Sequence, residues 1–217
     1  MSKNITSKKI RQICSCKNIK ELENLYDKWA PTYEEHQDRY NGIQGRIKTV
    51  NKFISWIKIK DIKILDAGCG TGRLAILLKK HGYKNIVGID ISKEMLKIAN
   101  DRDLYTKLYK LELGRHLTFP DNSFEGVISC GVFTEGHATA KAFDELIRVT
   151  KKRGYIVFTL REDIYEKNNF KEKQNYLEFN KYWKLVEITK PFLMLPKGSK
   201  LMHRIWVYEK LQKGERK

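Results

Sequence analysis

The sequence predicts an α/β protein built on a doubly wound, mostly parallel sheet, with a helical extension before it. Two observations carry this prediction: strand-like and helix-like segments alternate from residue 63 to residue 160, and a glycine-rich turn follows the first strand. Regular alternation of this kind places helices on both faces of a parallel sheet. We therefore expect an N-terminal helical extension or lid at residues 1–55 and the main domain at residues 56–217.

Short apolar segments are the expected strands, at Lys63–Ala67, Asn85–Ile91, Leu108–Leu113, Glu125–Cys130 and Tyr155–Leu160. The periodic segments between them are the expected helices, at Gly72–Lys80, Ser92–Asn100 and Thr139–Thr150. Ser92 is a favourable N-cap, and Gly82 and Gly154 lie where helices or turns end. After a polar helix-like stretch, two further strand-like runs, Lys184–Ile188 and His203–Lys210, can close the sheet as a hairpin.

Composition limits the class of protein. The length of 217 residues suits one hydrophobic core, and four cysteines without paired metal-ligand spacing suggest a reducing compartment. The N-terminus is polar and basic, and no apolar run approaches the roughly 18 residues of a membrane span. We therefore expect a cytoplasmic protein that does not bind membranes and is a monomer.

The net charge of +17 raises the question of a nucleic-acid partner. The basic residues are scattered along the whole chain. This distribution favours the interpretation that most lysines are solvated and that the charge reflects a bias in composition. A polyanionic partner remains the alternative.

The stretch KILDAGCGTGRLA, Lys63–Ala75, has glycines at positions 68, 70 and 72. A glycine-rich turn after the first strand of such a sheet lets the backbone approach a nucleotide-like ligand closely. A dinucleotide fingerprint would require a glycine at position 73, where this chain has Arg73. Asp90, 22 residues after Gly68, can accept hydrogen bonds from ribose hydroxyls in any adenosine ligand.

Three stretches together resemble the signature regions of class I S-adenosylmethionine-dependent methyltransferases: DAGCGTG (66–72), VGIDIS (87–92) and LTFPDNSFEGVISCGV (117–132). With YDKWAPTYEE (26–35) and GVFTEGHA after the fourth strand, the sequence is most similar to the methyltransferase-like proteins of the Williams–Beuren syndrome region. The resemblance spans roughly residues 60 to 160. It implies a seven-stranded, Rossmann-like sheet that binds S-adenosylmethionine, with S-adenosylhomocysteine as the product, and it leaves the acceptor open.

The resemblance also implies roles in the loop that follows the first strand. Gly68, Gly70 and Gly72 would let the chain turn beneath the methionine part of the cofactor, and Cys69 and Thr71 would present backbone groups. Asp66 would orient the loop and favour the ammonium group. Asp90 would hold the ribose.

The adenine site is expected at the next two strand ends. Ile91 and Met95 would offer apolar surface to the ring, although both also suit an ordinary core. Many relatives carry an aspartate where this chain has Leu113, so Leu113 and Gly114 would border the adenine, with backbone groups, Glu112 or Arg115 meeting its amino group. Cys130, Gly131 and Val132, just past the fourth strand, would line the methyl-transfer face.

Tyr26, Trp29 and Tyr33 recur at spacings of three and four, so they form one stripe on a helix. The stripe either packs the extension onto the domain or forms a lid over the cofactor, and both can hold together. In the lid, a tyrosine hydroxyl or Arg46 would meet the cofactor's carboxylate. A closed, dry site would align the acceptor and exclude water.

Methyl transfer needs an acceptor that is held in position beside the methyl group and, for some acceptors, a base. His137 lies just beyond the transfer face and is the candidate general base, with Glu135 as a neighbouring alternative. The other reading of His137 is a residue at a helix start that faces water. The histidines have no partners at metal-ligand spacing, so we expect no metal.

The sequence therefore predicts a methyltransferase with an unidentified acceptor. A small molecule is favoured, because no added RNA-binding domain is evident, and a protein or tRNA acceptor comes second because of the charge. A cofactor-binding but catalytically silent partner protein stays open, since fold does not fix function. A nicotinamide-dependent reductase is disfavoured by Arg73.

Overall fold

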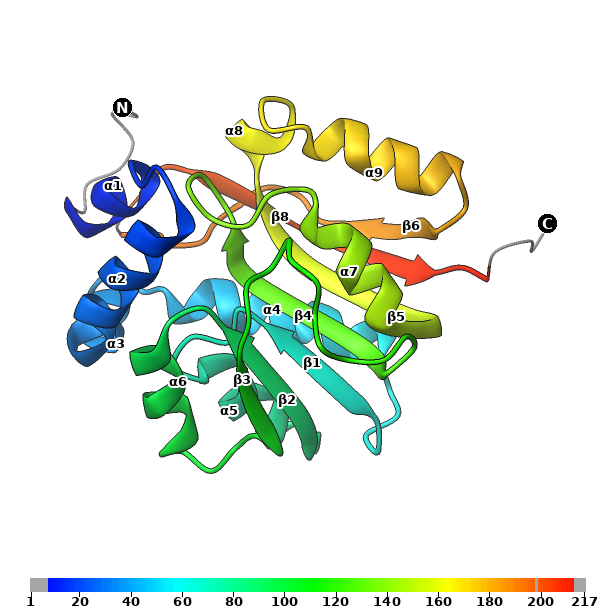
Figure 1. The fold of residues 1–217 in the computed structure, drawn as a ribbon, viewed down its shortest axis with the longest axis horizontal. Coiled ribbons are helices and arrows are strands. Elements are labelled where there is room, and N and C mark those ends of the chain that lie inside the picture. Colours follow the sequence, from blue (N-terminus) through cyan, green and yellow to red (C-terminus); the bar gives the residue numbers. More distant parts are fainter. Residues whose placement is uncertain (1–7, 198, 213–217) are drawn as a thin grey trace.

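One mixed sheet organises the part of the chain that the computed structural model describes, residues 8–197 and 199–212 (Figure 1). Its strands are β1 Lys63–Ala67, β2 Asn85–Asp90, β3 Lys107–Lys110, β4 Phe124–Phe133, β5 Thr150–Arg161, β6 Trp183–Ile188, β7 Phe192–Leu193 and β8 Met202–Lys210. They run in the order β3-β2-β1-β4-β5-β8-β6, and the two-residue β7 pairs beside β8.

The first five strands pair in parallel, whereas β8 is antiparallel to both β5 and β6. The predicted doubly wound, mostly parallel sheet is confirmed, as are both expected C-terminal strands. The short β7 adds an eighth strand to the seven that the resemblance implied.

Helices cover both faces of the sheet and the carboxyl ends of its parallel strands. They are α1 Lys8–Cys14, α2 Ile19–Trp29, α3 Tyr33–Arg39, α4 Ile43–Trp56, α5 Arg73–Lys80, α6 Lys93–Asn100, α7 Ala142–Val149, α8 Glu162–Tyr165 and α9 Phe170–Phe179, with a 3₁₀ turn at Ala30–Thr32. Buried residues of α4 and α5 form one core layer, and those of α7, α8 and α9 belong to another. Within the described ranges, no helix is long and apolar enough to cross a membrane.

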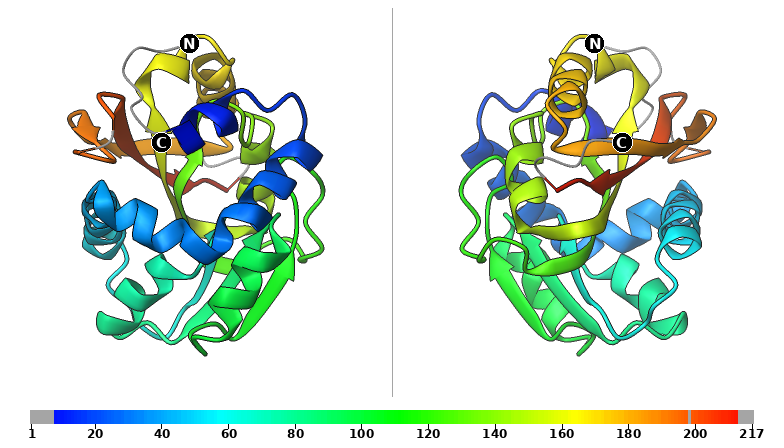
Figure 2. Two further views of the ribbon diagram at one scale, coloured as in Figure 1. Left: turned by 90° about the vertical axis from the view of Figure 1, so that its left-hand side faces the viewer. Right: turned by 90° about the vertical axis from the view of Figure 1, so that its right-hand side faces the viewer.

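Helix α4 packs on the sheet, and the expected boundary between residues 55 and 56 falls in its last turn. Val50 and Phe53 are buried, and a Cβ on Gly126 of β4 would lie only 2.8 Å from the Phe53 ring. This close packing makes α4 a covering layer of the sheet. Helices α1 to α3 instead lie across the carboxyl ends of the parallel strands (Figures 1 and 2).

Two strands differ from the sequence prediction at the end that faces these helices. Strand β3 ends at Lys110 rather than Leu113, because its partner β2 ends at Asp90. Strand β4 continues to Phe133 rather than ending at Cys130, and its register shifts between Ser129 and Phe133. The expectation that residues 130–132 lie past the strand was wrong, since they form a bulge inside it. Bulges of this kind redirect side chains near functional sites.

Two smaller expectations also change. Helix α7 begins at Ala142 rather than Thr139, after a turn in which the Ala142 N–H donates to the Thr139 carbonyl oxygen. Gly154 lies inside β5 rather than at the end of a turn. Ser92 is the N-cap of α6 as predicted, since its Oγ accepts from the Met95 N–H at 3.1 Å.

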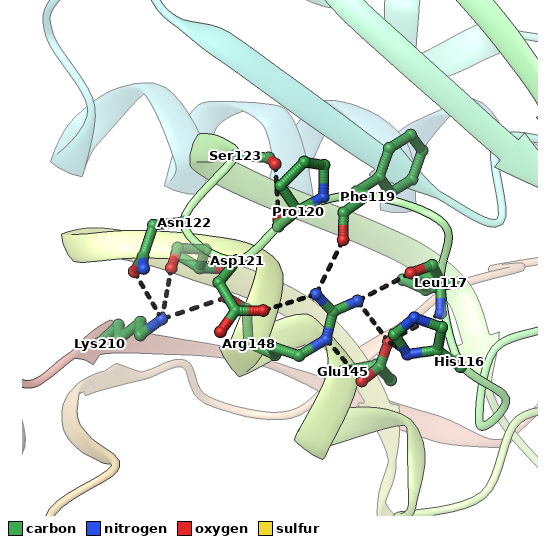
Figure 3. A network of polar contacts seen from close by, with 11 residues as sticks. His116, Leu117, Phe119, Pro120, Asp121, Asn122, Ser123, Glu145, Arg148 and Lys210 are labelled. Atoms are coloured by element: carbon green, nitrogen blue, oxygen red, sulfur yellow. Dashed lines mark hydrogen bonds and ion pairs between the residues drawn. The ribbon is translucent and has the colours of Figure 1, made fainter.

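The connection before β4 is held by Arg148 of α7, as Figure 3 shows. Its guanidinium donates to the carbonyl oxygens of Leu117 and Phe119, each at 2.8 Å, and pairs with Asp121 and Glu145. Bidentate and charge-assisted contacts are the strong class of hydrogen bond. The stretch LTFPDNS of the third signature region is therefore fixed to α7, and these contacts are structural.

Candidate functional site

Two adjoining hollows lie at the carboxyl ends of the parallel strands. The first cavity has about 670 Å³ of empty space, part of it open to solvent. It is lined by Ile19, Leu22, Tyr26, Tyr33, Gly68, Gly70, Ile89, Asp90, Ile91, Met95, Leu111, Leu113, Cys130, Gly131, Val132, His137 and Ala138. Its walls come from the loop after β1, the ends of β2 and β4, and helix α2.

The glycines of the loop serve two different purposes. Gly68 has a φ of +81°, and a Cβ there would lie 2.2 Å from the Val132 side chain, so no larger residue fits. Gly70 has a φ of +54°, and a Cβ there would meet nothing within 4 Å. Gly70 therefore leaves open space at the floor of the first cavity, where backbone and ligand can approach closely.

Asp90 holds this loop in place. Its Oδ2 accepts from the Gly70 N–H at 2.8 Å, and its Oδ1 accepts from the Ser92 N–H at 2.9 Å. Burial raises the pKa of this carboxyl, opposed by these backbone hydrogen bonds. Asp90 thus lines the first cavity with a carboxylate already oriented by two amides.

Asp66, which was expected to orient the loop and favour the ammonium group, has a buried Oδ1 without a hydrogen bond among the described residues. Its side chain is fully buried beneath the loop, and its Oδ2 accepts from the Tyr105 hydroxyl at 2.7 Å. Burial raises its pKa to about 7. Asp66 lines none of the hollows described here, and neither do Gly72, which is the N-cap of α5, and Gly114.

An apolar slot forms the far side of the first cavity. Ile91 and Met95 face it from the start of α6, and Leu111 and Leu113 face it from the chain that leaves β3. Met95 is 1% exposed, so it belongs to the core and to the cavity wall at once. A flat, apolar ring is the kind of group that such a slot accommodates.

The second cavity has about 760 Å³ of empty space, again partly open to solvent. It is lined by Ile13, Cys14, Tyr26, Trp29, Tyr33, Gln37, Arg46, Cys130, Gly131, Thr134, His137, Arg161, Met194, Leu195, Ser199, Leu201 and His203. The two cavities share five residues, namely Tyr26, Tyr33, Cys130, Gly131 and His137. We call these five residues the shared wall.

The β4 bulge builds the sheet side of the shared wall. The Gly131 N–H turns away from the cavities and donates to Thr159 Oγ1 at 2.8 Å. Gly131 has a φ of +78°, and a Cβ there would meet nothing within 4 Å. The bulge therefore leaves an opening where the two cavities meet.

The aromatic stripe of α2 and α3 builds the opposite side. The Tyr26 and Trp29 rings stack at 5.9 Å, and Trp29 meets the Tyr33 ring edge-on at 4.8 Å. Trp29 is 2% exposed, whereas the two tyrosines reach the shared wall. The stripe therefore packs the extension onto the domain and also covers the cavities.

Four acidic residues of α2 and α3 hold these helices to the domain, and we call them the acidic clasp. The contacts are Glu23–Lys110 at 2.5 Å, Asp27–Ser92 at 2.6 Å, Glu34–Arg102 at 2.5 Å and Asp38–Arg73 at 2.6 Å. Arg102 also donates to the Thr71 carbonyl oxygen at 2.8 Å. The clasp thus connects the covering helices directly to the glycine-rich loop.

Arg46 of α4 is a cation without a carboxylate partner among the described residues. Its guanidinium donates to the Tyr33 hydroxyl at 2.9 Å, to the Gly42 carbonyl oxygen and to Gln37 Oε1, all of them neutral. Arg46 lines the second cavity and also a smaller hollow beside Gly70 and Thr71. An anionic group in that hollow would meet an uncompensated charge.

His137 lies in the shared wall and not at a helix start facing water. Its Nδ1 lies 3.0 Å from the Glu135 carbonyl oxygen, and its Nε2 lies 2.7 Å from the Tyr26 hydroxyl. Burial lowers its pKa to about 4, so the ring is neutral at physiological pH. Because a carbonyl oxygen only accepts, Nδ1 carries the proton and Nε2 accepts from Tyr26.

Comparison with known proteins gives the family. Residues 65–158 match the family described as a methyltransferase domain. The chain is 30% identical to methyltransferase-like protein 27 of Homo sapiens over 141 residues, which is 64% of this chain and 57% of that protein. It is 29% identical to demethylmenaquinone methyltransferase of Symbiobacterium thermophilum over 144 residues, which is 63% of this chain and 57% of that protein.

The fold agrees with these matches. A putative S-adenosylmethionine-dependent methyltransferase from Listeria monocytogenes superposes with a TM-score of 0.60 at 15% identity, over 78% of this chain and 100% of that chain. The chain belongs to the class I S-adenosylmethionine-dependent methyltransferases. The resemblance read from the three signature regions is confirmed. The matched region spans little more than half the length of the two sequence relatives.

Several cavity residues of this chain were not among the residues expected from the sequence. Ile19 and Leu22 precede Tyr26 by seven and four residues, so the helical period of the stripe would have included them. Leu111 and Ala138 line the first cavity from loop positions, because β3 ends at Lys110 and α7 begins only at Ala142. Arg161 is the last residue of β5 and directly follows the apolar run Tyr155–Leu160.

The most remote part of the second cavity could not be found from local patterns. Met194, Leu195, Leu201 and His203 come from the connection between β7 and β8 and from the start of β8. They approach Arg46 and Trp29 only because β8 inserts between β5 and β6. Sequence spacing gives no indication of such a contact. Within the described ranges, no group of three or more His, Cys, Asp or Glu side chains could hold a metal ion.

Proposed function

We propose that this protein transfers the methyl group of S-adenosylmethionine to a small-molecule acceptor. The observation that carries the proposal is the shared wall, because it lets two ligands meet at one opening beside Gly131. The first cavity suits the methyl donor and the second suits the acceptor. A fully filled second cavity would have favoured a silent cofactor-binding protein instead.

The residues of the first cavity fit an adenosine ligand. Asp90 offers an oriented carboxylate to ribose hydroxyls, and Ile91, Met95 and Leu113 offer apolar surface to the adenine. Glu112 and Arg115 pair with each other at 3.5 Å and do not line this cavity, so backbone groups remain for the adenine amino group. The apolar slot and the Asp90 carboxylate together support the assignment of the first cavity as the donor site.

The smaller hollow fits the amino-acid end of the donor. Gly68, Gly70 and Thr71 provide its backbone walls, and Arg46 provides a cation with no carboxylate of its own. A carboxylate from the ligand would supply the missing countercharge, and the buried position strengthens that pairing. Cys69 lines the same hollow as a neutral thiol, since burial raises its pKa well above the usual value.

When bound, S-adenosylmethionine supplies an activated methyl group. The protein then has to align the acceptor and exclude water, which the Tyr26, Trp29 and Tyr33 stripe can do from above. For an acceptor that loses a proton, Tyr26 can receive it at its hydroxyl oxygen while passing its own proton to His137 Nε2. His137 is thus the candidate base, acting through Tyr26, and its low pKa makes it a weak one.

The test uses the full chain with radiolabelled S-adenosylmethionine and a cell extract separated into metabolites, RNA and protein. We expect label to enter the metabolite fraction. Label in RNA or protein would contradict a small-molecule acceptor, and no transfer despite cofactor binding would indicate a silent protein.

A further inference from the structure

The second cavity has an unusual charge balance. Among its lining residues, all of them in the described part of the chain, there are two arginines and no aspartate or glutamate. Its two histidines are neutral, because burial lowers the pKa of each to about 4. Any charge that the walls present to an acceptor is therefore positive.

Arg161 directs one side of its guanidinium toward this cavity. Its Nε and Nη2 donate to Asp163 and Glu135, whose side chains are 40% and 52% exposed and lie outside the lining. Its Nη1 donates to Thr134 Oγ1 at 3.0 Å and contacts Cys14 Sγ at 3.7 Å, and both of these residues line the cavity. The cavity side of Arg161 thus has only neutral, weak acceptors, although the side chain is just 2% exposed.

His203 adds a polar atom that lacks a partner. The side chain is 8% exposed, and its Nδ1 is buried without a hydrogen bond of normal length and angle among the described residues, although the Leu201 backbone lies near the ring. A buried polar atom without a partner costs roughly 1 to 3 kcal/mol, so such atoms commonly mark a place where a ligand or water binds. Met194, Leu195 and Leu201 surround the remaining volume with apolar surface.

We propose that the methyl acceptor is a small organic acid with an apolar body. Its acidic group would replace the weak contacts of Arg161 Nη1 near His203, and its body would pack on Met194, Leu195 and Leu201. A cationic acceptor is disfavoured, because its desolvated charge would meet the Arg161 guanidinium and no carboxylate among the lining residues. This inference rests on the proposed function, since it assigns the second cavity to the acceptor.

The test uses three probes with the same apolar body: phenylacetate, phenylacetamide and phenethylamine. Each is titrated into the full chain alone and into the full chain saturated with S-adenosylhomocysteine, with total tryptophan fluorescence as the readout, because Trp29, one of the four tryptophans, lines the cavity. We expect phenylacetate to bind about tenfold or more tightly than the amine, with the amide between them. Equal affinities, a preference for the amine, or no binding of phenylacetate at millimolar concentration would overturn the proposal.

A matched pair of variants tests the role of charge. Ser199 lines the cavity, and its Oγ accepts from the Leu201 N–H at 3.1 Å. Ser199→Asp and Ser199→Asn differ by one charge, and both keep an acceptor for that N–H. We expect Ser199→Asp to lose about tenfold in phenylacetate affinity and Ser199→Asn to keep most of it. Equal effects of both variants would contradict an anion site.

The design separates this inference from the proposed function. Calorimetry with S-adenosylhomocysteine is run on the same samples, and both Ser199 variants should bind it as the unmodified chain does. Failure to bind S-adenosylhomocysteine would remove the proposed function, while the ranking of the three probes still decides whether the cavity selects acids.

Discussion

The two cavities are built from different kinds of wall. The floor of the first cavity is formed by residues close to one another in the sequence, at the ends of β1 and β2 and in the segments that follow them, while α2, the chain after β3 and the β4 bulge complete its walls. The second is formed by α1 to α4, the end of β5 and the start of β8, which are far apart in the sequence. Short sequence motifs can therefore locate the part of the first cavity around Gly70 and Asp90, whereas the second cavity can be located only from the whole fold.

The shared wall is where the largest effect is expected. His137→Ala should slow methyl transfer by about 10²-fold, the low end of the range for general bases, because the ring is a weak base. Turnover is measured with whichever acceptor the labelling experiment identifies, alongside the affinity for S-adenosylhomocysteine. Tyr26→Phe should give a similar loss if the proton passes through Tyr26. Unchanged turnover in His137→Ala would remove the residue from the mechanism.

Arg46 lines the second cavity and the smaller hollow beside Gly70, and its role can be isolated by choice of ligand. Arg46→Met should weaken S-adenosylhomocysteine binding by roughly 1.5 to 3 kcal/mol, the value of a charged hydrogen bond. Methylthioadenosine, which lacks the amino-acid end, should bind the variant and the unmodified chain alike. Arg46→Lys keeps the charge and serves as the control. A loss that is the same for both ligands would mean that Arg46 acts only by packing.

The buried acid beneath the first cavity should make stability depend on pH. The pKa of Asp66 is raised to about 7, so its contribution to stability is fully present below its unfolded value near 4 and is lost as pH rises through 7. Asp66→Asn should therefore raise the free energy of unfolding at pH 8 by roughly 1 to 3 kcal/mol and by much less at pH 4.5. Urea denaturation at both pH values is the measurement. A variant that is less stable at pH 8 would contradict this account.

A buried histidine of the second cavity should make stability depend on pH in the opposite direction. The pKa of His203 is lowered to about 4. Its contribution to stability is therefore fully present above pH 6.5 and is lost as the pH falls through 4. His203→Phe should reduce the loss of stability between pH 6.5 and pH 4 by roughly 1 kcal/mol or more. The control is the same titration of Asp66→Asn, which should leave this acid loss in place.

The acidic clasp should give the smallest effect. Its pairs are partly exposed, so each contributes about 0.2 to 1 kcal/mol, and salt should weaken them. Hydrogen exchange of residues 19–39 should be faster in Glu34→Gln than in the unmodified chain, and S-adenosylhomocysteine should slow exchange in both. Equal protection with and without the ligand would leave the aromatic stripe as packing only.

The sequence was informative where a function depends on backbone geometry over a few residues. Gly70 and Asp90 could be selected because a tight turn and a strand end fix their positions. Asp66 was expected in the donor site, but no pattern shows that Tyr105 occupies one of its oxygens or that the loop covers it. Cys130 and Gly131 were selected from the sequence and line both cavities, although the bulge that puts them in the shared wall has no local signal. His203 and Leu201 could not be selected, because only the antiparallel insertion of β8 brings them to the second cavity.

The proposed function requires the first cavity to be a donor site formed by the loop after β1 and by Asp90. Isothermal calorimetry of the full chain with S-adenosylhomocysteine tests it most directly, with Asp90→Ala as the variant and Asp66→Asn, whose side chain does not line the cavity, as the control. We expect a dissociation constant in the micromolar range, about −8 kcal/mol of binding free energy, and a loss of roughly 1 to 3 kcal/mol in Asp90→Ala only. No heat and no thermal shift with the unmodified chain, or equal losses in both variants, would contradict it.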